Sequence, residues 1–407
     1  MIEQQCDVNG ISIKYKTKSR KYDTTHLVVV FSGFGGGNEF TYDFVNALQE
    51  CPANILWIKD DFHDHCAYYM CRNMNFEIET AVHKFINEKL SELNLTKEQC
   101  TLAGFSKGGT AALYFGIKYQ FKNIVSTVPQ FNIGTYASEN WPIVAEHMLG
   151  DVSVSNLEEI NGILPKAIKN DNNYDKNIYL LTSESDIQYL SEIQPNLHTL
   201  IKYKNFNLLL SKSILVREHN QVTAHHAPLI LGILYSLSQG ATPIYGYTEL
   251  SGDKESLPSK PSKEPLAILK KIKVDRGNLF VEGISILRGL SCKDYKDIDV
   301  KLCLSSDSGE TIIDLAKTHR PSLTRQLYDG TYVNYDKGWF CTLAFKGISI
   351  NLIPDGKHSL SIIISCQGVT KKSDMTVDTQ NDNKPLTNTS GIKSFSENGK
   401  VYLYKNQ

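Results

Sequence analysis

The stretch that decides the fold reads Thr101-Leu102-Ala103-Gly104-Phe105-Ser106-Lys107-Gly108-Gly109. Its apolar start predicts the end of a buried strand, and the following residues 110–119 predict a helix. Gly-x-Ser-x-Gly between a strand and a helix is the pattern of a nucleophile elbow, where small neighbours are needed because Cβ atoms would collide with the strand and helix. The pentapeptide alone also occurs in ordinary turns. The flanking strand and helix favour a catalytic Ser106.

The overall composition excludes several classes of protein. The chain has 407 residues, which predicts two domains. Its net charge is −1, so no basic field indicates binding to nucleic acid. No apolar run reaches the ~20 residues of a membrane-spanning helix, and residues 1–16 lack the apolar core of a signal peptide. The nine cysteines are scattered without a Cys-x-x-Cys pair, which fits a reducing cytoplasm.

A second glycine-rich loop follows the β-branched run at residues 27–31, which predicts a strand buried on both faces. The loop begins Ser32-Gly33-Phe34-Gly35, and so many glycines indicate backbone amides that approach a ligand closely. In the elbow architecture this loop gives one oxyanion-hole amide, and the residue after the nucleophile gives the other. We therefore expect the N–H groups of Phe34 and Lys107 to form the oxyanion hole. A phosphate loop is the alternative, but neither Gly-x-Gly-x-x-Gly nor Gly-Lys-Ser/Thr is present.

The acid of a catalytic triad is expected just past a later strand, predicted at residues 177–182. Asp186 has the best position and Glu184 is the alternative. An aspartate there can also be a simple helix cap. The two carboxylates lie in the same loop, so the assignment to Asp186 rests on its distance from the strand end.

The histidine of the triad is expected after a last strand, predicted at residues 213–218. Three histidines follow it, and the order Ser…Asp…His is that of α/β-hydrolases. We expect His225 to be the general base, with His226 as the alternative, because both precede a predicted helix at residues 227–237. His219 is expected to end the strand and stiffen the loop.

A cluster of carboxylates and imidazoles at residues 60–65 raises the hypothesis of a metal site. A single six-residue loop without a second cluster elsewhere is a poor source of converging ligands. A solvated active-site loop is the favoured interpretation, and no metal is expected.

The domain pattern changes near residue 250. Residues 1–250 predict an α/β-hydrolase domain, with a cap at 130–176 where clean periodicity is lost, and Pro- and Ser-rich residues 251–265 predict a linker. Short strands separated by turns at 266–407 predict a smaller all-β sandwich, in which exposed Trp339 and Tyr335 would stack on a sugar ring or else lie in the core. A polar stretch near 376–390 predicts partial flexibility.

Several motifs of the first domain resemble a bacterial family of capsular-polysaccharide O-acetyltransferases with an α/β-hydrolase fold, similar to the acetyltransferase of the accessory Sec system. The resemblance covers about residues 1–245. The sequences that carry it are Gly104-Phe105-Ser106-Lys107-Gly108-Gly109, Val128-Pro129-Gln130, Ser32-Gly33-Phe34-Gly35, Tyr68-Tyr69 and Glu218-His219-Asn220.

The resemblance implies a bacterial cytoplasmic enzyme, located in part at the inner face of the membrane with the capsule assembly machinery. It would transfer acetyl from acetyl-CoA to a hydroxyl of a capsular or surface polysaccharide through an acetyl-serine, using Ser106, Asp186 and His225. A carbohydrate or lipid esterase with the same triad is the alternative. The side chain of Lys107 departs from common esterases and receives no role at this stage.

Overall fold

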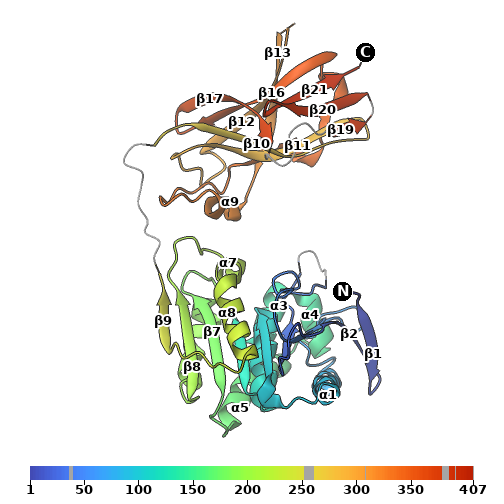
Figure 1. Ribbon diagram of the computed structural model, residues 1–407, viewed down its shortest axis with the longest axis vertical. Coiled ribbons are helices and arrows are strands. Elements are labelled where there is room, and N and C mark those ends of the chain that lie inside the picture. Colours follow the sequence, from blue (N-terminus) through green and yellow to red (C-terminus); the bar gives the residue numbers. More distant parts are fainter. Residues whose placement is uncertain (36–39, 252–260, 308, 378–384, 390, 407) are drawn as a thin grey trace. The chain divides into compact units, whose positions relative to one another are not determined.

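The computed structural model describes residues 1–35, 40–251, 261–307, 309–377, 385–389 and 391–406. The chain divides into two compact units, Met1–Gly252 and Asp253–Gln407 (Figure 1). The predicted α/β-hydrolase fold followed by a mainly β domain is confirmed. Most of the predicted linker, at 252–260, lies outside the described residues.

The first unit is built on one sheet with the strand order β1-β2-β4-β3-β5-β6-β7-β8-β9 among the described residues. The strands from β4 to β9 are parallel, and the β1–β2 hairpin joins β4 in antiparallel orientation. Because parallel strands end at one edge, the loops after them gather along that edge. The strands span Gln4–Val8, Ile11–Lys18, Leu27–Phe31, Asn54–Ile58, Cys100–Phe105, Asn123–Thr127, Asn177–Ser183, Asn205–Ser211 and Tyr247–Leu250.

Helices cover this sheet, so its central strands are buried (Figure 1). Helices α2 (Lys107–Lys118) and α8 (Ala227–Ser238) both pack against β3, β5 and β6, and α1 (Glu77–Glu92) packs against β1 and β2. Every residue of β3 is buried, as its continuous apolar sequence predicts.

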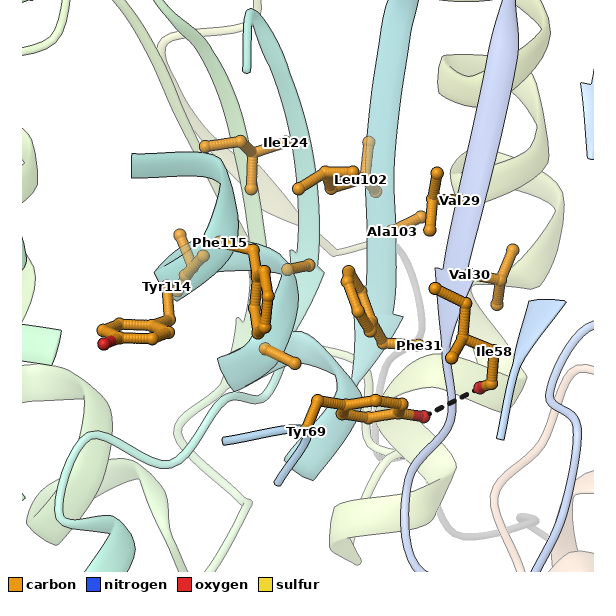
Figure 2. Close-up of a cluster of buried hydrophobic side chains, with 14 of the residues drawn as sticks. Val29, Val30, Phe31, Ile58, Tyr69, Leu102, Ala103, Tyr114, Phe115 and Ile124 are labelled. Atoms are coloured by element: carbon orange, nitrogen blue, oxygen red, sulfur yellow. Dashed lines mark hydrogen bonds between the residues drawn. The ribbon is translucent and has the colours of Figure 1, made fainter. Parts of the chain in front are cut away.

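The core beneath the predicted active-site edge combines aliphatic and aromatic side chains (Figure 2). Phe31 at the end of β3 lies 5.4 Å from Phe115 of α2 and 4.9 Å from Tyr69, measured between ring centroids. Burial of one such side chain stabilises the fold by about 1.5–3 kcal/mol. These contacts fix the ends of β3 and β5 relative to α2.

The last strands of this sheet differ from the prediction. Residues 213–218 form turns, and the strands are β8, which ends at Ser211, and β9 after helix α8. The reason is local, since Ser213 accepts the N–H of Leu215 with its Oγ and the N–H of Val216 with its carbonyl. His219 therefore begins helix α7 (His219–His225) directly after a turn instead of ending a strand.

The predicted cap region at 130–176 contains three helices, and its role as a cap stays a prediction. They are α3 (Ile133–Asn140), α4 (Pro142–Leu149) and α5 (Val154–Asn170). Within the described part of the chain, no helix is both long enough and apolar enough to cross a membrane.

The second unit contains one hydrogen-bonded set of strands in the order β18-β10-β11-β14-β13-β12-β16-β21-β20-β19, with β15 and β17 paired to β11 and β16. A separate hydrophobic core fills it. The strands span Pro265–Asp275 (β10), Asn278–Leu287 (β11), Ile298–Ser306 (β12), Gly309–Thr318 (β13), Trp339–Thr342 (β14), Ile348–Ser349 (β15), Gly356–Cys366 (β16), Val369–Asp374 (β17), Thr376–Val377 (β18), Pro385–Thr389 (β19), Ile392–Glu397 (β20) and Lys400–Lys405 (β21).

Two predictions for this unit concern aromatic side chains and flexibility. Tyr335 is 6% exposed and accepts the N–H of Gly289, so the alternative of a place in the core holds for it. Trp339 is partly buried against the core, with the Arg320 guanidinium 4.8 Å from the centre of its ring. Of the predicted flexible stretch, 378–384 and 390 lie outside the described residues, and the flanking parts belong to β18 and β19.

Candidate active site

Ser106 lies in a strained turn between β5 and α2. Its φ of 53° and ψ of −126° are unusual for a residue with a Cβ. A Cβ on Gly104 would approach the Gly108 carbonyl to 2.3 Å, and one on Gly108 would approach the Phe31 carbonyl oxygen to 2.2 Å. Both glycines are thus required for this turn. Lys107 is the first residue of α2, so its N–H has no acceptor within the helix.

A buried carboxylate and an imidazole are paired at the same edge of the sheet. Asp186, in the loop after β7, lies 2.8 Å through Oδ2 from Nδ1 of His219, and its Oδ1 accepts the N–H of Gln188 at 3.0 Å. A carboxylate only accepts, so we assign the proton to Nδ1 of His219. Its Nε2 is then an acceptor, and this buried atom has no hydrogen-bond partner among the described residues.

The other predicted triad residues lie elsewhere. Nε2 of His226 is 2.7 Å from Oγ of Ser211, and the His225 ring lies 4.8 Å from the His226 ring. Glu184 pairs with Lys212 at the surface. The predicted pairing of His225 with Asp186 is therefore wrong: the structure pairs Asp186 with His219. The error came from the strand predicted at 213–218, because a strand there would have carried His219 away from Asp186.

Two glutamines, which the sequence analysis did not single out as site residues, connect Ser106 to Asp186. Nε2 of Gln130, in the loop after β6, donates to Oγ of Ser106 at 2.8 Å and to Oε1 of Gln188 at 2.9 Å. Gln188 in turn donates its backbone N–H to Asp186. Gln130 is fully buried and held through Thr110 of α2, which accepts its N–H at 2.8 Å. The available signal was the position of Gln130 directly after a buried strand and Val128-Pro129.

The two predicted oxyanion-hole residues lie near each other at this edge. The loop after β3 places Phe34 with its ring centroid 5.2 Å from Nζ of Lys107. The same ring stacks on Trp141 at 4.4 Å and 13°. The structure therefore brings together the loops after β3, β5, β6, β7 and β8. The oxyanion role of the two N–H groups stays a prediction.

A mostly apolar pocket of about 400 Å³ adjoins this loop. Phe34 and Trp141 form part of its wall, with Phe40, His65 and Val144 among the other lining residues. Trp141 and Val144 come from the region predicted as the cap. A pocket of this size and character is suited to part of a small-molecule substrate.

Two aspartates anchor the loop at residues 60–65 to the rest of the first unit. Asp60 accepts three backbone N–H groups, and Asp61 pairs with Lys14 at 2.6 Å. His65 lies 4.7 Å from the ring of His147, and burial lowers the pKa of His147 to about 4. No group of three or more His, Cys, Asp or Glu side chains within the described ranges is placed to hold a metal ion.

A parallel sheet with a nucleophile elbow, an acid and a histidine arriving in the order Ser…Asp…His defines the α/β-hydrolase class. Residues 24–220 match the protein family described as the accessory Sec system GspB-transporter. The predicted resemblance to the accessory Sec system protein is confirmed over these residues.

Two curated relatives and one solved structure illustrate this similarity. The chain is 27% identical over 166 residues, 41% of its length, to an accessory Sec system protein of Staphylococcus aureus. It is 30% identical over 112 residues, 27% of its length, to an accessory Sec system protein of Streptococcus gordonii. The matches span 27% and 21% of those relatives. A variant of the capsule O-acetyltransferase of Neisseria meningitidis serogroup A in complex with CoA is 22% identical, with a TM-score of 0.48, over 57% of this chain and 94% of that one.

Proposed function

We propose that the first unit is an O-acetyltransferase that moves acetyl from acetyl-CoA to a hydroxyl of a bacterial capsular or surface polysaccharide. One observation carries the proposal: Asp186 holds His219 at the edge where the elbow presents Ser106, and Nε2 of His219 is left without a partner among the described residues. Ser106 is the nucleophile, His219 the general base and Asp186 the group that orients it.

The reaction begins with attack by Oγ of Ser106 on the thioester carbonyl, while its proton moves to Nε2 of His219. The tetrahedral oxyanion is stabilised by the N–H groups of Phe34 and Lys107, and loss of one such donor typically reduces the rate ~10²–10³-fold. Collapse breaks the C–S bond, and CoA leaves as a thiol with the proton from His219. A sugar hydroxyl then attacks the acetyl-serine and gives its proton to His219. The bond from the acetyl carbon to Oγ of Ser106 breaks, His219 returns the proton to Oγ, and the acetylated sugar leaves.

Gln130 supports this assignment of protons. Because its amide donates to Oγ of Ser106, one lone pair of the hydroxyl is occupied, and the hydroxyl proton needs another acceptor. Nε2 of His219 is a buried acceptor at the same edge without a partner in the described structure. The network therefore favours transfer of the serine proton to His219.

The remaining parts of the proposal concern substrate and location. We assign the pocket beside Phe34 and Trp141 to the bound substrates, and the helices of residues 130–176 to a cap over them. The second unit would bind glycan. Action on capsule precursors implies the bacterial cytoplasm, at the inner face of the membrane with the assembly machinery.

A carbohydrate or lipid esterase is the second candidate, because the same triad also serves hydrolysis and the pocket is mostly apolar. In the transferase a sugar hydroxyl attacks the acyl-serine, whereas in the esterase water attacks it.

The test follows thiol release from acetyl-CoA with and without alkali-deacetylated capsular polysaccharide, with mass spectrometry of the polymer. A transferase releases thiol much faster with the polysaccharide and adds 42 Da per acetyl group, roughly the mass of C₂H₂O. Glycan-independent hydrolysis of an aryl acetate without transfer would support the esterase. Equal rates for the wild type and Ser106→Ala would reject both.

A further inference from the structure

The side chain of Lys107, next to the nucleophile, is completely buried. Its Nζ lies 2.6 Å from Oδ2 of Asp60 and donates to the carbonyl of Ser32 at 3.0 Å, with the two paired side chains 0% and 2% exposed. Ser32 belongs to the loop that leads to Phe34. A cation so close to Ser106, bonded to the loop across the site, needs an explanation.

Asp60 also fixes the segment that contains Tyr69, a second residue that bonds the loop after β3. Its carboxylate accepts the N–H groups of Ala67, Tyr68 and Tyr69 at 3.0–3.1 Å, which fixes the backbone of that segment. The hydroxyl of Tyr69 then accepts the N–H of Ser32 at 2.7 Å and donates to the carbonyl of Ile58 at 3.0 Å (Figure 2).

The backbone before Phe34 is therefore held at successive polar groups. The N–H of Ser32 is bonded to Tyr69, its carbonyl to Lys107, and the N–H of Gly33 to Oδ2 of Asp43 at 2.6 Å. The ring of Phe34 lies over the same ammonium group. The Ser32–Gly33 peptide is thus held at both its carbonyl and its N–H, and it is the peptide directly before the one that carries the Phe34 N–H.

Stability alone is a weak reason for such a pair. Replacement of a buried ion pair by neutral groups of similar volume is often neutral or stabilising, since desolvation of two charges offsets their attraction. Positioning is a stronger reason, because a displacement of about 1 Å in an active site can reduce the rate ~10²-fold.

We propose that Lys107 and Asp60 are positioning residues that set the direction of the Phe34 N–H. Lys107 would act twice: its backbone N–H is one oxyanion donor, and its side chain orients the loop that carries the other. This inference rests on the proposed function, in which Ser106 is acylated and both N–H groups stabilise the oxyanion.

The test uses the full chain with both charges removed, Lys107→Met/Asp60→Asn. The double change leaves no unpaired buried charge, but it removes the acceptor of the Tyr68 N–H and the donor to the Ser32 carbonyl. We therefore expect a folded protein whose melting temperature is lowered by the loss of these two hydrogen bonds. We expect kcat for 4-nitrophenyl acetate to fall about 10²-fold while KM changes less than about threefold, because an oxyanion donor acts in the transition state. Fluorophosphonate labelling of Ser106 should slow by a similar factor.

The chain offers a matched control in Lys176→Met/Asp171→Asn. This pair is equally buried, with side chains 1% and 2% exposed and a separation of 2.8 Å, but it lies before β7 at the opposite edge of the sheet. We expect its removal to leave kcat and the labelling rate unchanged. The control separates loss of a buried ion pair in general from loss of the pair beside Ser106.

The outcomes are distinct. A folded Lys107→Met/Asp60→Asn variant with the wild-type kcat would overturn the inference while leaving the triad intact. A wild-type protein that neither turns over nor becomes labelled at Ser106 would reject the proposed function, and the inference with it. If the double variant does not fold, Lys107→Arg decides: it keeps the buried charge, but a planar guanidinium cannot reproduce the geometry of an ammonium that bonds both Asp60 and the Ser32 carbonyl. An unchanged kcat in this variant overturns the inference.

Discussion

The two buried Lys–Asp pairs of the sheet have the same chemistry at opposite edges. Lys176 and Asp171 lie where β7 begins, and Lys107 and Asp60 lie where β3, β4 and β5 end. Burial alone would raise the pKa of Asp171, yet hydrogen bonds from Lys176 and Gln120 outweigh it and lower that pKa. For Lys176 burial has the larger effect, and it lowers the pKa of the ammonium group.

The difference lies in what each pair holds. In addition to their ion pair, Lys176 donates to the Gln120 side chain, and Asp171 accepts from the Tyr203 hydroxyl. These bonds connect the segment before β7 to the ends of neighbouring helices. Lys107 bonds the loop that leads to Phe34, beside Ser106. Ligands of open parallel sheets bind at the carboxyl edge, so the proposal gives the Lys107–Asp60 pair a role in the site and the Lys176–Asp171 pair a structural role.

The largest effect is expected for Ser106→Ala at the carboxyl edge. Removal of the nucleophile should lower kcat for 4-nitrophenyl acetate about 10⁶-fold, which leaves only the residual acceleration that an oxyanion hole and substrate binding supply. Steady-state kinetics and the absence of fluorophosphonate labelling measure it. Labelling that persists in this variant would place the nucleophile elsewhere.

The next effect distinguishes two histidines of one helix. His219→Ala should lower kcat about 10⁵-fold, because Ser106 would lose its general base, whereas His225→Ala should change it less than about threefold. Parallel kinetics of the two purified variants give the answer. The reverse ranking would restore the pairing predicted from the sequence.

Asp186→Asn should reduce kcat about 10⁴-fold, since an amide would no longer hold the proton on Nδ1 of His219. Glu184→Gln is the matched control, because Glu184 pairs with Lys212 at the surface and should leave kcat unchanged. The pH dependence of kcat would show whether the titrating base is altered. Retained activity in Asp186→Asn would move the acid role to Glu184.

A smaller effect is expected for Gln130→Ala. The loss of one neutral donor to Oγ of Ser106 should lower kcat about 10-fold, which is the rate equivalent of about 1.4 kcal/mol. Ser236→Ala is a control at a partly buried hydroxyl of α8 that donates to the Gly232 carbonyl at 2.8 Å. Equal kinetics of both variants would remove Gln130 from the site.

The amino edge should affect stability and leave the chemical step unchanged. Burial lowers the pKa of His26, which bonds Thr101 through Nε2 at 2.8 Å, to about 4. The unfolded chain takes up this proton near pH 6.5, so the stabilisation is complete above that pH and is lost as the pH falls towards 4. The free energy of unfolding should therefore fall by about 3 kcal/mol over this pH range because of His26. Chemical denaturation of the wild type and His26→Gln between about pH 7 and 4 should show the smaller pH dependence in the variant, with kcat unchanged.

Local patterns predicted much of the fold. The apolar run at residues 27–31 indicated a strand buried on both faces, and the glycines around Ser106, with a strand before and a helix after them, indicated a turn in which the two backbones nearly touch. The carboxylate after β7 was found from chain order alone. The strand at 205–211 was missed because 213–218 looked equally apolar, while the turn formed by Ser213 was not recognised.

The sequence by itself determined the elbow, the order Ser…Asp…His and the α/β class, because each depends on residues close together in the chain or on their order along it. Only the tertiary structure decided that His219, and not His225, meets Asp186, that Gln130 reaches Ser106, and that Lys107 bonds a loop 75 residues away. These contacts join loops that follow different strands. Which loops meet depends on the order of the strands in the parallel sheet. The number of residues between two loops in the chain does not reveal that order.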